Sequence, residues 1–266
     1  MKTLQDYIDK LNSLNFKEMY NNDFFWTWDK TDDELEAVFT VDEEIGMGGA
    51  HHLDTSVLKG KICLNIDSEI EGVMTVGCAG GYIYDTFIPI EWSEESGTKM
   101  TISLSNLQGG HSGAEIDKNR ANANKLMGRF LYGLKKKAEY ALISLTGGQK
   151  DNAITRECTA EFLTDSVAEV KAYAKELQEQ LREEYTGSDE NITFEITEKG
   201  TATAEVLHPT SQEKIVFYLQ NVPFGIQKMS GTIKGLVETS SNIGILRLDR
   251  DELFASSSVR SSVDAA

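Results

Sequence analysis

The residues Met100-Thr101-Ile102-Ser103-Leu104 alternate strictly between apolar and polar side chains. Successive side chains of a β-strand point to opposite faces, so this alternation predicts an antiparallel strand with one face in a core and the other in solvent. Further strand-like segments lie near 192–207, 236–248 and 252–261. Together they predict an antiparallel sheet that buries one of its faces.

Helical spacing of apolar residues is found between these strands, over residues 119–140, 166–186 and 211–221. The second stretch carries its apolar stripe at Val167, Val170, Ala174, Leu177 and Leu181. Ser166 and Glu169 have the spacing of a capping box at its start. Helices packed on one face of an antiparallel sheet define an α+β domain.

Residues 80–266 are predicted to form this α+β domain. Before it, the runs Ala37–Val41 and Ile62–Ile66 are almost wholly apolar, which is typical of strands buried on both faces in a parallel, α/β arrangement. Residues 39–79 are therefore predicted to be an α/β fragment. The apolar spacing within residues 1–38 predicts a helical segment.

The chain is strongly acidic, with 43 Asp and Glu against 26 Lys and Arg and a net charge of −17. This charge repels nucleic acid and anionic membrane surfaces, so neither is expected as a partner. The sequence contains no bilayer-length apolar stretch and no apolar run of a secretion signal, which indicates a cytoplasmic protein. Cys63, Cys78 and Cys158 are widely spaced and odd in number, which favours reduced thiols.

Four carboxylates follow the two apolar runs directly: Asp42, Glu43, Glu44 and Asp67. Zinc and manganese ions accept carboxylate oxygens, and a neighbouring Glu that is not a ligand can act as general base on a metal-bound water. A solvated acidic loop is the alternative interpretation of the same run, because charge runs are common on protein surfaces.

Histidines occur in two places. His51-His52-Leu53-Asp54 has the spacing of a metal motif, but it lies in a stretch that is typical of a surface helix and loop. His111 lies in the glycine-rich turn Gly109–Gly113, where it could stabilise an oxyanion or bind a metal. A structural role for a single loop histidine remains the alternative.

Three polar residues lie at turns or strand ends: Asn152, Asn242 and Arg260. Each could equally serve local hydrogen bonding. Arg260 differs in that its planar guanidinium matches the geometry of a carboxylate, such as that of a peptide-like ligand.

Six segments occur in one order along the chain and together resemble aminoacyl-histidine dipeptidases, which are zinc dipeptidases of the cytosol. The resemblance runs from about Val38 to Val263. The segments are TVDEEIGMGGA (40–50), LNIDSEIEG followed by VGCAGG (64–81), LQGGHSGAEIDKNRANANKLM (107–127), GGQKDNAITREC (147–158), GLVETSSNIGIL (235–246) and SVRSSV (258–263).

This resemblance implies specific roles. Glu43 matches the general base that activates a metal-bridging water, Glu44 a ligand of one zinc ion, and Asp67 a ligand of the other. Residues 80–266 match the lid or dimerisation domain, in which His111 would reach the active site of the partner subunit and help to bind the oxyanion. A dipeptide substrate, two zinc ions and a homodimer are implied in turn.

Asn242 and Arg260 are implied as residues that hold the backbone and the carboxylate of the substrate. The family also requires a His-x-Asp pair before the Glu pair, a bridging Asp, and a His near its carboxyl terminus. His52-Leu53-Asp54 follows the Glu pair, so it is not a substitute. Thr155 stands where the family has proline, which predicts a weaker turn.

The segment NNDFFWTWDKTDDELEAVF (21–39) does not resemble a dipeptidase. It resembles the amino-terminal region of carbamoyltransferase-like proteins, which implies a different origin for residues 1–38. The chain has no carbamoyl-phosphate-binding motif, so transferase activity is not expected.

Two hypotheses follow from these patterns. One is a zinc-dependent dipeptidase acting on Xaa-His peptides, here in an incomplete form. The other is a non-catalytic remnant, a lid domain that dimerises or binds a peptide without hydrolysing it. Two carboxylates are too few ligands for a fixed two-zinc site, so the sequence as it stands favours the second.

Overall fold

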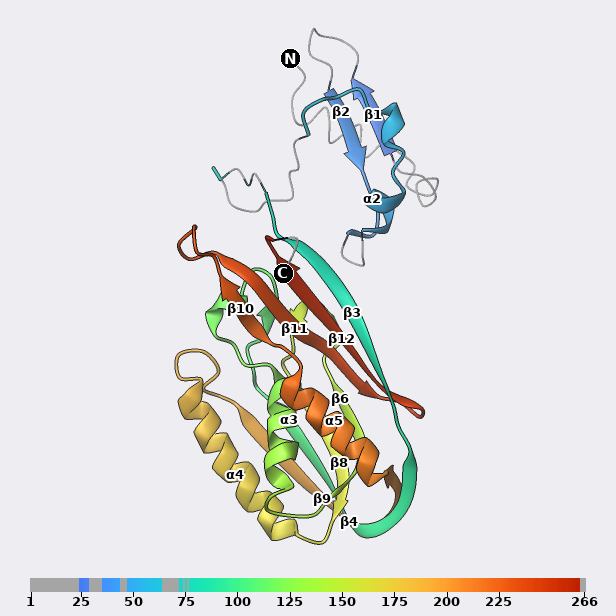
Figure 1. The fold of residues 1–266 in the computed structure, drawn as a ribbon, viewed down its shortest axis with the longest axis vertical. Helices are drawn as coiled ribbons and strands as arrows, with labels where there is room; N and C mark the ends of the chain where they lie inside the picture. The colour runs from blue at the N-terminus through green and yellow to red at the C-terminus, as the bar shows by residue number, and fades with distance from the viewer. Residues whose placement is uncertain are drawn as a thin grey trace, which may run out of the picture. The chain divides into compact units, whose positions relative to one another are not determined.

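The computed structural model describes residues 24–28, 35–43, 47–63, 72–73, 75 and 77–263. The chain divides into two compact units, Met1–Thr75 and Val76–Ala266 (Figure 1). Each unit has a β-sheet of its own.

The second unit holds most of the regular structure. Its strands are β3 (Gly80–Pro89), β4 (Trp92–Ser105), β5 (Gly110–His111), β6 (Ala141–Gly147), β7 (Ala153–Ile154), β8 (Cys158–Thr164), β9 (Thr193–Leu207), β10 (Gly225–Met229), β11 (Val237–Leu248) and β12 (Glu252–Ser261). Its helices are the 3-10 helix η4 (Ile116–Lys118) and the α-helices α3 (Ala123–Leu134), α4 (Val167–Glu184) and α5 (Pro209–Asn221).

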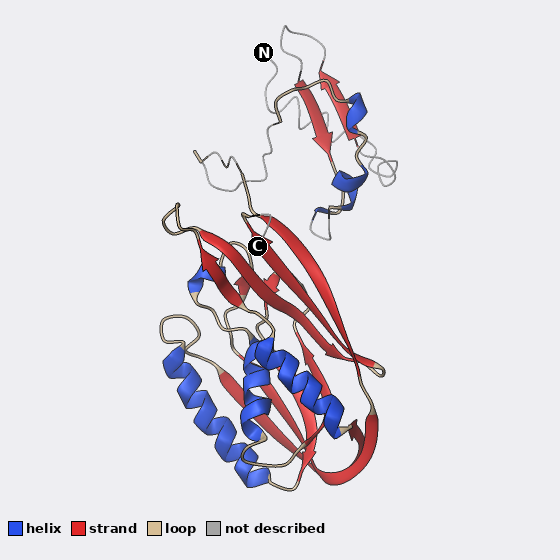
Figure 2. Cartoon of the chain, viewed as in Figure 1, coloured by secondary structure: helices blue, strands red, loops and turns tan. Residues whose placement is uncertain are grey.

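An eight-stranded antiparallel sheet forms the frame of this unit, in the order β3-β12-β11-β6-β8-β4-β9, with β10 paired to β11. The α-helices α3, α4 and α5 lie on one face of the sheet (Figures 1 and 2). The α+β architecture predicted from the sequence is therefore confirmed. The small ribbon of β5 and β7 is hydrogen bonded separately.

The core lies between the sheet and these helices. On β4, Met100, Ile102 and Leu104 are fully buried, as the alternating pattern predicted. Thr101 and Ser103 point to the other face, where their hydroxyls bond to side chains of β8. The predicted apolar stripe of α4 also lies in the core, because Val170, Ala174, Leu177 and Leu181 are buried there.

The ends of α3 and α4 differ from the predictions. Asn119 has a left-handed backbone (φ 53°), so α3 cannot begin at residue 119 and starts after Asn122. The Asn122 Oδ1 atom accepts hydrogen bonds from the N–H groups of Asn124 (2.9 Å) and Lys125 (3.2 Å).

The predicted capping box of α4 is absent. Ser166 precedes the helix, but its side chain makes no capping bond and its backbone (φ −103°, ψ 52°) is not extended. Thr164 accepts the Ser166 N–H with its Oγ1 (3.1 Å), which is the bond that the Glu of a capping box would accept. The same hydroxyl donates to the Glu139 carbonyl (2.6 Å).

The first unit contains two strands where the sequence predicted helix. β1 (Phe24–Trp28) pairs antiparallel with β2 (Leu35–Phe39), so the helical prediction for residues 1–38 is wrong at these positions. A run of aromatic residues favours a pleated surface over a helix stripe. Residues 1–23 lie outside the described residues.

The strands predicted at Ala37–Val41 and Ile62–Ile66 are not buried on both faces. Val38 and Phe39 are 38% and 49% exposed. Ile62 is 85% exposed and does not lie in a strand. β2 lies in a sheet of only two strands among the described residues, and Val38 and Phe39 are at its surface, unlike the side chains of a parallel strand covered on both faces. Residues 64–66 lie outside the described residues.

All three cysteines are free, as predicted. Cys158 is buried, and desolvation raises the pKa of its thiol. Among the described residues, no helix has the length and apolar character to cross a membrane.

The C-terminal end of α5 is held by one ammonium group. Lys125 Nζ donates to the carbonyls of Leu219 (2.6 Å), Gln220 (3.1 Å) and Val222 (2.7 Å). All three of its N–H bonds are thus used on carbonyls that the helix itself leaves unpaired. Burial lowers the pKa of this lysine, but the three carbonyls and the helix dipole still favour the cation.

We expect Lys125→Met to lower the free energy of unfolding by about 1–3 kcal/mol, since hydrogen bonds to a charged group contribute on this order. Urea unfolding followed by circular dichroism measures the change. Lys135→Met is the matched control, because Lys135 pairs only with Glu213 at the surface (2.6 Å) and such pairs contribute about 0–1 kcal/mol. Equal losses in both variants would contradict the proposed anchoring of α5.

Candidate functional site

His111 projects from the short ribbon that β5 forms with β7. It pairs with Ala153, and the next residue, Ser112, donates its N–H to the Asn152 carbonyl (2.9 Å). The ribbon therefore places His111 beside the loop that carries Asn152. Its side chain is exposed to solvent.

A glutamate clamp fixes the backbone of His111. The Oε2 atom of Glu115 accepts the His111 N–H (3.0 Å), and its Oε1 pairs with Arg120 Nη2 (2.7 Å). The hydrogen bond from His111, followed by that from Arg120, holds the pKa of Glu115 below its usual range. The glycine at position 110 (φ 137°) leaves room for the Glu115 carboxylate, because a Cβ there would stand 2.4 Å from Glu115 Oε2.

The imidazole is held in one tautomer. The Nδ1 atom of His111 accepts the N–H groups of Gly113 (3.1 Å) and Ala114 (3.0 Å). A backbone N–H can only donate, so Nδ1 must carry a lone pair. In the neutral ring the proton then lies on Nε2, which is left as a hydrogen-bond donor.

Arg260 reaches the same place from β12. A Cβ added to Gly113 would stand 2.9 Å from Arg260 Nε, 3.0 Å from its Cζ and 3.0 Å from His111 Cε1. The guanidinium and the imidazole thus lie against one glycine, although 149 positions separate them in the sequence. Arg260 Nε is buried and has no hydrogen-bond partner among the described residues, so a donor remains unused beside His111.

Asn242 lies at the buried base of this site, 1% exposed. Its Nδ2 donates to the carbonyls of Asp151 (3.0 Å) and Ala153 (2.9 Å), and its Oδ1 accepts from Asn122 Nδ2 (3.1 Å). Both amide N–H bonds are therefore used to hold the loop that pairs with His111. This geometry fits a positioning residue better than a group that contacts substrate.

Thr155 strengthens the turn that the sequence predicted to be weak. It is buried, and its hydroxyl lies 3.1 Å from the Ile243 carbonyl and 3.0 Å from that of Gly244. It also accepts a hydrogen bond from Asn124 Nδ2 (3.2 Å). A proline has no side-chain donor and could not make these contacts.

The sequence did not single out Gly113, Glu115 or Arg120, which fix His111 and Arg260 in place. The spacing of Glu115, four residues after His111, was the available signal. It could not be interpreted from sequence, because the contact is made to the backbone N–H of His111 and depends on the positive φ of Gly110.

Of the predicted acidic half-site, only Asp42 and Glu43 lie among the described residues. Glu43 lies in the first unit with an exposed side chain, while Glu44 and Asp67 lie outside the described residues. His51 and His52 form the end of an exposed helix, α2 (Gly48–His52), as predicted. Within the described ranges, no group of three or more His, Cys, Asp or Glu side chains is placed to hold a metal ion.

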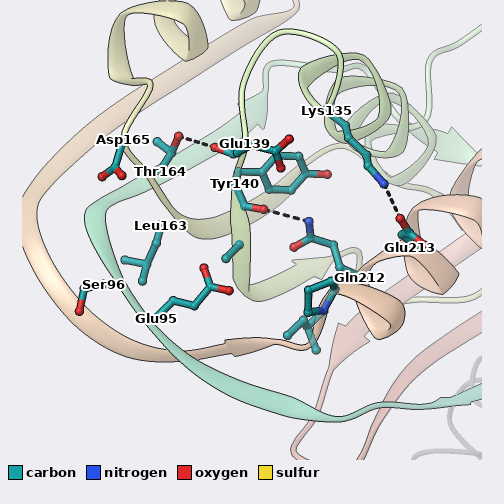
Figure 3. A pocket seen from close by; sticks show the side chains of 13 residues that line it. Glu95, Ser96, Lys135, Glu139, Tyr140, Leu163, Thr164, Asp165, Gln212 and Glu213 are labelled. Carbon is teal, nitrogen blue, oxygen red and sulfur yellow. Dashed lines mark hydrogen bonds and ion pairs between the residues drawn. The ribbon is translucent and has the colours of Figure 1, made fainter.

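The second unit also has a hollow of about 340 Å³ near the start of β4, at the end of the strand away from the His111 turn (Figure 3). Gln212 Nε2 donates to the Tyr140 carbonyl there (3.0 Å), and Lys135 pairs with Glu213. Ser96 lines this hollow near the start of β4, whereas the His111 turn follows the end of β4. Roughly 30 Å of strand separates them, so this hollow is not part of the His111 site.

Comparison with known proteins defines the class. Residues 102–189 match the family model of the peptidase dimerisation domain of M20 type. This segment includes His111 and its supporting glutamate, as well as α3 and α4. This part of the second unit is therefore similar to a peptidase dimerisation domain.

The relatives are dipeptidases. Over 235 residues the chain is 33% identical to the cytosol non-specific dipeptidase of Escherichia coli (strain K12), covering 87% of this chain and 48% of that protein. The crystal structure of aminoacylhistidine dipeptidase from Vibrio alginolyticus matches with a TM-score of 0.73 at 35% identity, again over 87% and 48% of the two chains. The resemblance to aminoacyl-histidine dipeptidases is confirmed, and the chain spans about half the length of these relatives.

We expect His111 to be the Nε2–H tautomer when neutral, because two backbone donors occupy Nδ1. Long-range proton–nitrogen NMR near pH 8.5 distinguishes the two ring nitrogens. Gly113→Ala should disturb this arrangement, since its Cβ would press on both His111 and Arg260. Gly231→Ala serves as the control, because a Cβ at Gly231 would meet nothing within 4 Å and its backbone is not left-handed. A neutral ring protonated at Nδ1 in the unsubstituted protein would refute the assignment.

Proposed function

We propose that this chain is the peptide-binding, lid-type portion of a zinc-dependent dipeptidase that acts on Xaa-His dipeptides. The observation that supports it most directly is the convergence of His111 and Arg260 on Gly113. One supplies an N–H donor at Nε2 and the other a guanidinium with an unused donor. A dipeptide offers a matching pair, a carbonyl oxygen and a terminal carboxylate.

His111 is the proposed ligand of the carbonyl. Its Nε2–H would donate to that oxygen, and the bond would strengthen as negative charge develops there. Because Nδ1 is tied to two backbone amides, the ring has no need to reorient when the peptide binds. Under this proposal His111 serves the active site of the partner subunit.

Arg260 is the proposed ligand of the carboxylate. A guanidinium binds a carboxylate through two parallel N–H bonds, and it stays charged at all accessible pH values. It makes no ion pair within the described residues, so no internal acid competes for it. Asn242 is proposed to position the loop beneath both groups.

Zinc is the proposed metal of the whole enzyme, with Glu43 as general base and Glu44 and Asp67 as ligands. Within the described residues, no three His, Cys, Asp or Glu side chains are placed to hold a metal ion, and Glu44 and Asp67 lie outside those residues. The binding of the peptide is therefore the part of the function that residues 77–263 support.

A second candidate is a non-catalytic module that binds a peptide or dimerises without hydrolysis. The sequence favours it, because Glu44 and Asp67 are too few ligands for a fixed two-zinc site. The two candidates share the same peptide site and differ only in whether metal and turnover accompany binding.

The proposed partner is a second copy of the chain, in keeping with the matched dimerisation domain. Nucleic acid and anionic membranes are not proposed as partners, because the net charge of −17 repels them. The Escherichia coli relative is named as a cytosol enzyme, and we propose the cytoplasm for this chain as well.

Arg260→Gln should weaken the binding of β-alanyl-histidine at least tenfold, because a charge-assisted hydrogen bond contributes about 1.5–3 kcal/mol. Calorimetric titration of the full chain measures the affinity. Arg247→Gln is the matched control, since Arg247 lies on the neighbouring strand and pairs with Asp249 (2.8 Å). The proposal fails if a folded Arg260→Gln variant binds as tightly as the unsubstituted chain.

We expect the purified chain to hold less than one zinc ion and to leave β-alanyl-histidine intact, since Glu44 and Asp67 are two ligands where a closed site needs about four. Atomic absorption after dialysis and a chromatographic assay for free histidine measure both. Stoichiometric zinc, with turnover abolished in Glu43→Gln, would establish hydrolysis by this chain instead.

A further inference from the structure

Three of the seven arginines of the chain have no carboxylate partner among the described residues. Ion pairs join Arg120 to Glu115, Arg129 to Glu184, Arg247 to Asp249 and Arg250 to Glu205. The unpaired ones are Arg156, Arg182 and Arg260. Acidic residues outnumber basic ones by 43 to 26, so a shortage of carboxylates is not the reason.

Arg156 and Arg182 line one hollow of about 540 Å³ at the carboxyl end of β4. Its other lining residues are Asn106, Leu107, Gln108, Asn191 and Thr193. None of the seven is acidic. In a chain of net charge −17, a concave surface with two cations and no lining anion is conspicuous.

Both guanidinium groups are held by their inner nitrogens. Arg156 Nε donates to the Leu107 carbonyl (3.2 Å). Arg182 Nε donates to the Ile192 carbonyl (2.7 Å), and its Nη2 makes a longer bond to Thr193 Oγ1 (3.3 Å). Both terminal nitrogens of Arg156 and the Nη1 of Arg182 remain without a hydrogen-bond partner in residues 77–263. Side chains anchored in this way lose little entropy when a ligand binds.

Gly109 lets Arg156 cross the backbone to the hollow. Its φ of 65° is left-handed, and a Cβ there would stand 2.2 Å from Arg156 Cγ and 2.7 Å from its Cδ. Any other residue at this position would displace the arginine. The path of the side chain is therefore part of the local fold.

The adjacent carboxylate is already engaged. Asp189 is 1% exposed, and its two oxygens accept the N–H groups of Gln108 (2.6 Å) and Ala121 (2.7 Å). These bonds hold it in the protein interior and join the turn after β4 to the start of α3. It does not serve as a counter-ion for Arg156 or Arg182.

We infer that Arg156 and Arg182 form a binding site for a small oxyanion, a phosphate or a carboxylate. Two guanidinium groups can direct several N–H donors at such an anion, and charge-assisted bonds of this kind are the strongest that side chains make. The site is distinct from the pair His111 and Arg260, and it does not rest on the proposed dipeptidase function.

Binding would connect two parts of the fold. Arg156 follows β7, which pairs with the strand of His111, while Arg182 lies in the last turn of α4. An anion held by both would join the His111 ribbon to that helix. The amide resonances of Leu107, Gln108 and Thr193 should therefore shift on binding.

The test is NMR titration of the full chain with inorganic phosphate and, separately, with acetate, at constant ionic strength because exposed charges are screened by salt. We expect saturable shifts at Leu107, Gln108 and Thr193, and an affinity at least tenfold weaker in Arg156→Gln and in Arg182→Gln. Arg129→Gln is the matched control, since Arg129 already pairs with Glu184, and it should change the affinity less than twofold. The anion that binds more tightly, phosphate or acetate, identifies the class of oxyanion that the site takes.

Absence of saturable shifts with both anions would overturn the inference, as would shifts that persist unchanged in Arg156→Gln. Equal weakening in Arg129→Gln would also overturn it, because it would indicate attraction by overall charge alone. Should Arg182→Gln fail to fold, Arg156→Gln decides the question, since Arg156 is exposed and makes a single hydrogen bond.

Discussion

A buried network of amide and hydroxyl groups joins α3, the loop before β8 and the bulge of β11, and the candidate site depends on it. Asn122 caps α3 with its oxygen and donates from its nitrogen to Asn242 and to the Ile243 carbonyl. Thr155 and Asn124 donate to the same carbonyl. Because buried polar groups are costly when unpaired, these segments can pack in few other ways. The ribbon that carries His111 takes its position from them.

The close packing around this network explains several glycines. A Cβ on Gly244 would stand 2.4 Å from the Lys150 carbonyl oxygen and 2.5 Å from that of Asp151, so backbone meets backbone there. The register of β11 shifts at the same place, between Ile243 and Ile245. Asn242 directly precedes this bulge, and both N–H bonds of its side chain go to carbonyls of the loop before β8.

The sequence predicted the frame of the second unit because periodicity reports which side of an element is buried. The alternation at Met100–Leu104 and the stripe from Val170 to Leu181 both lie in the core as expected. The candidate site was harder to predict from the sequence, because it depends on contacts between segments that are far apart along the chain. Residue type indicated His111 and Arg260 separately, but their meeting at Gly113 follows from the placement of β12 and from a glycine that no periodic pattern marks. The helix predicted over residues 1–38 failed at Phe24–Trp28 for a local reason, because clustered aromatic residues favour a strand.

The position of β12 in the sheet also determines when the site can exist during synthesis. This strand lies between β3 and β11, so both of its neighbours are synthesised before it. The end of β3 precedes the end of β12 by about 170 residues. As the chain leaves the ribosome, β3 must wait for a partner that emerges much later. Sheets with such distant pairings fold slowly and expose unpaired edges in the meantime. Arg260 arrives with β12, so the contact that His111 and Arg260 share at Gly113 is completed only after β12 has been made.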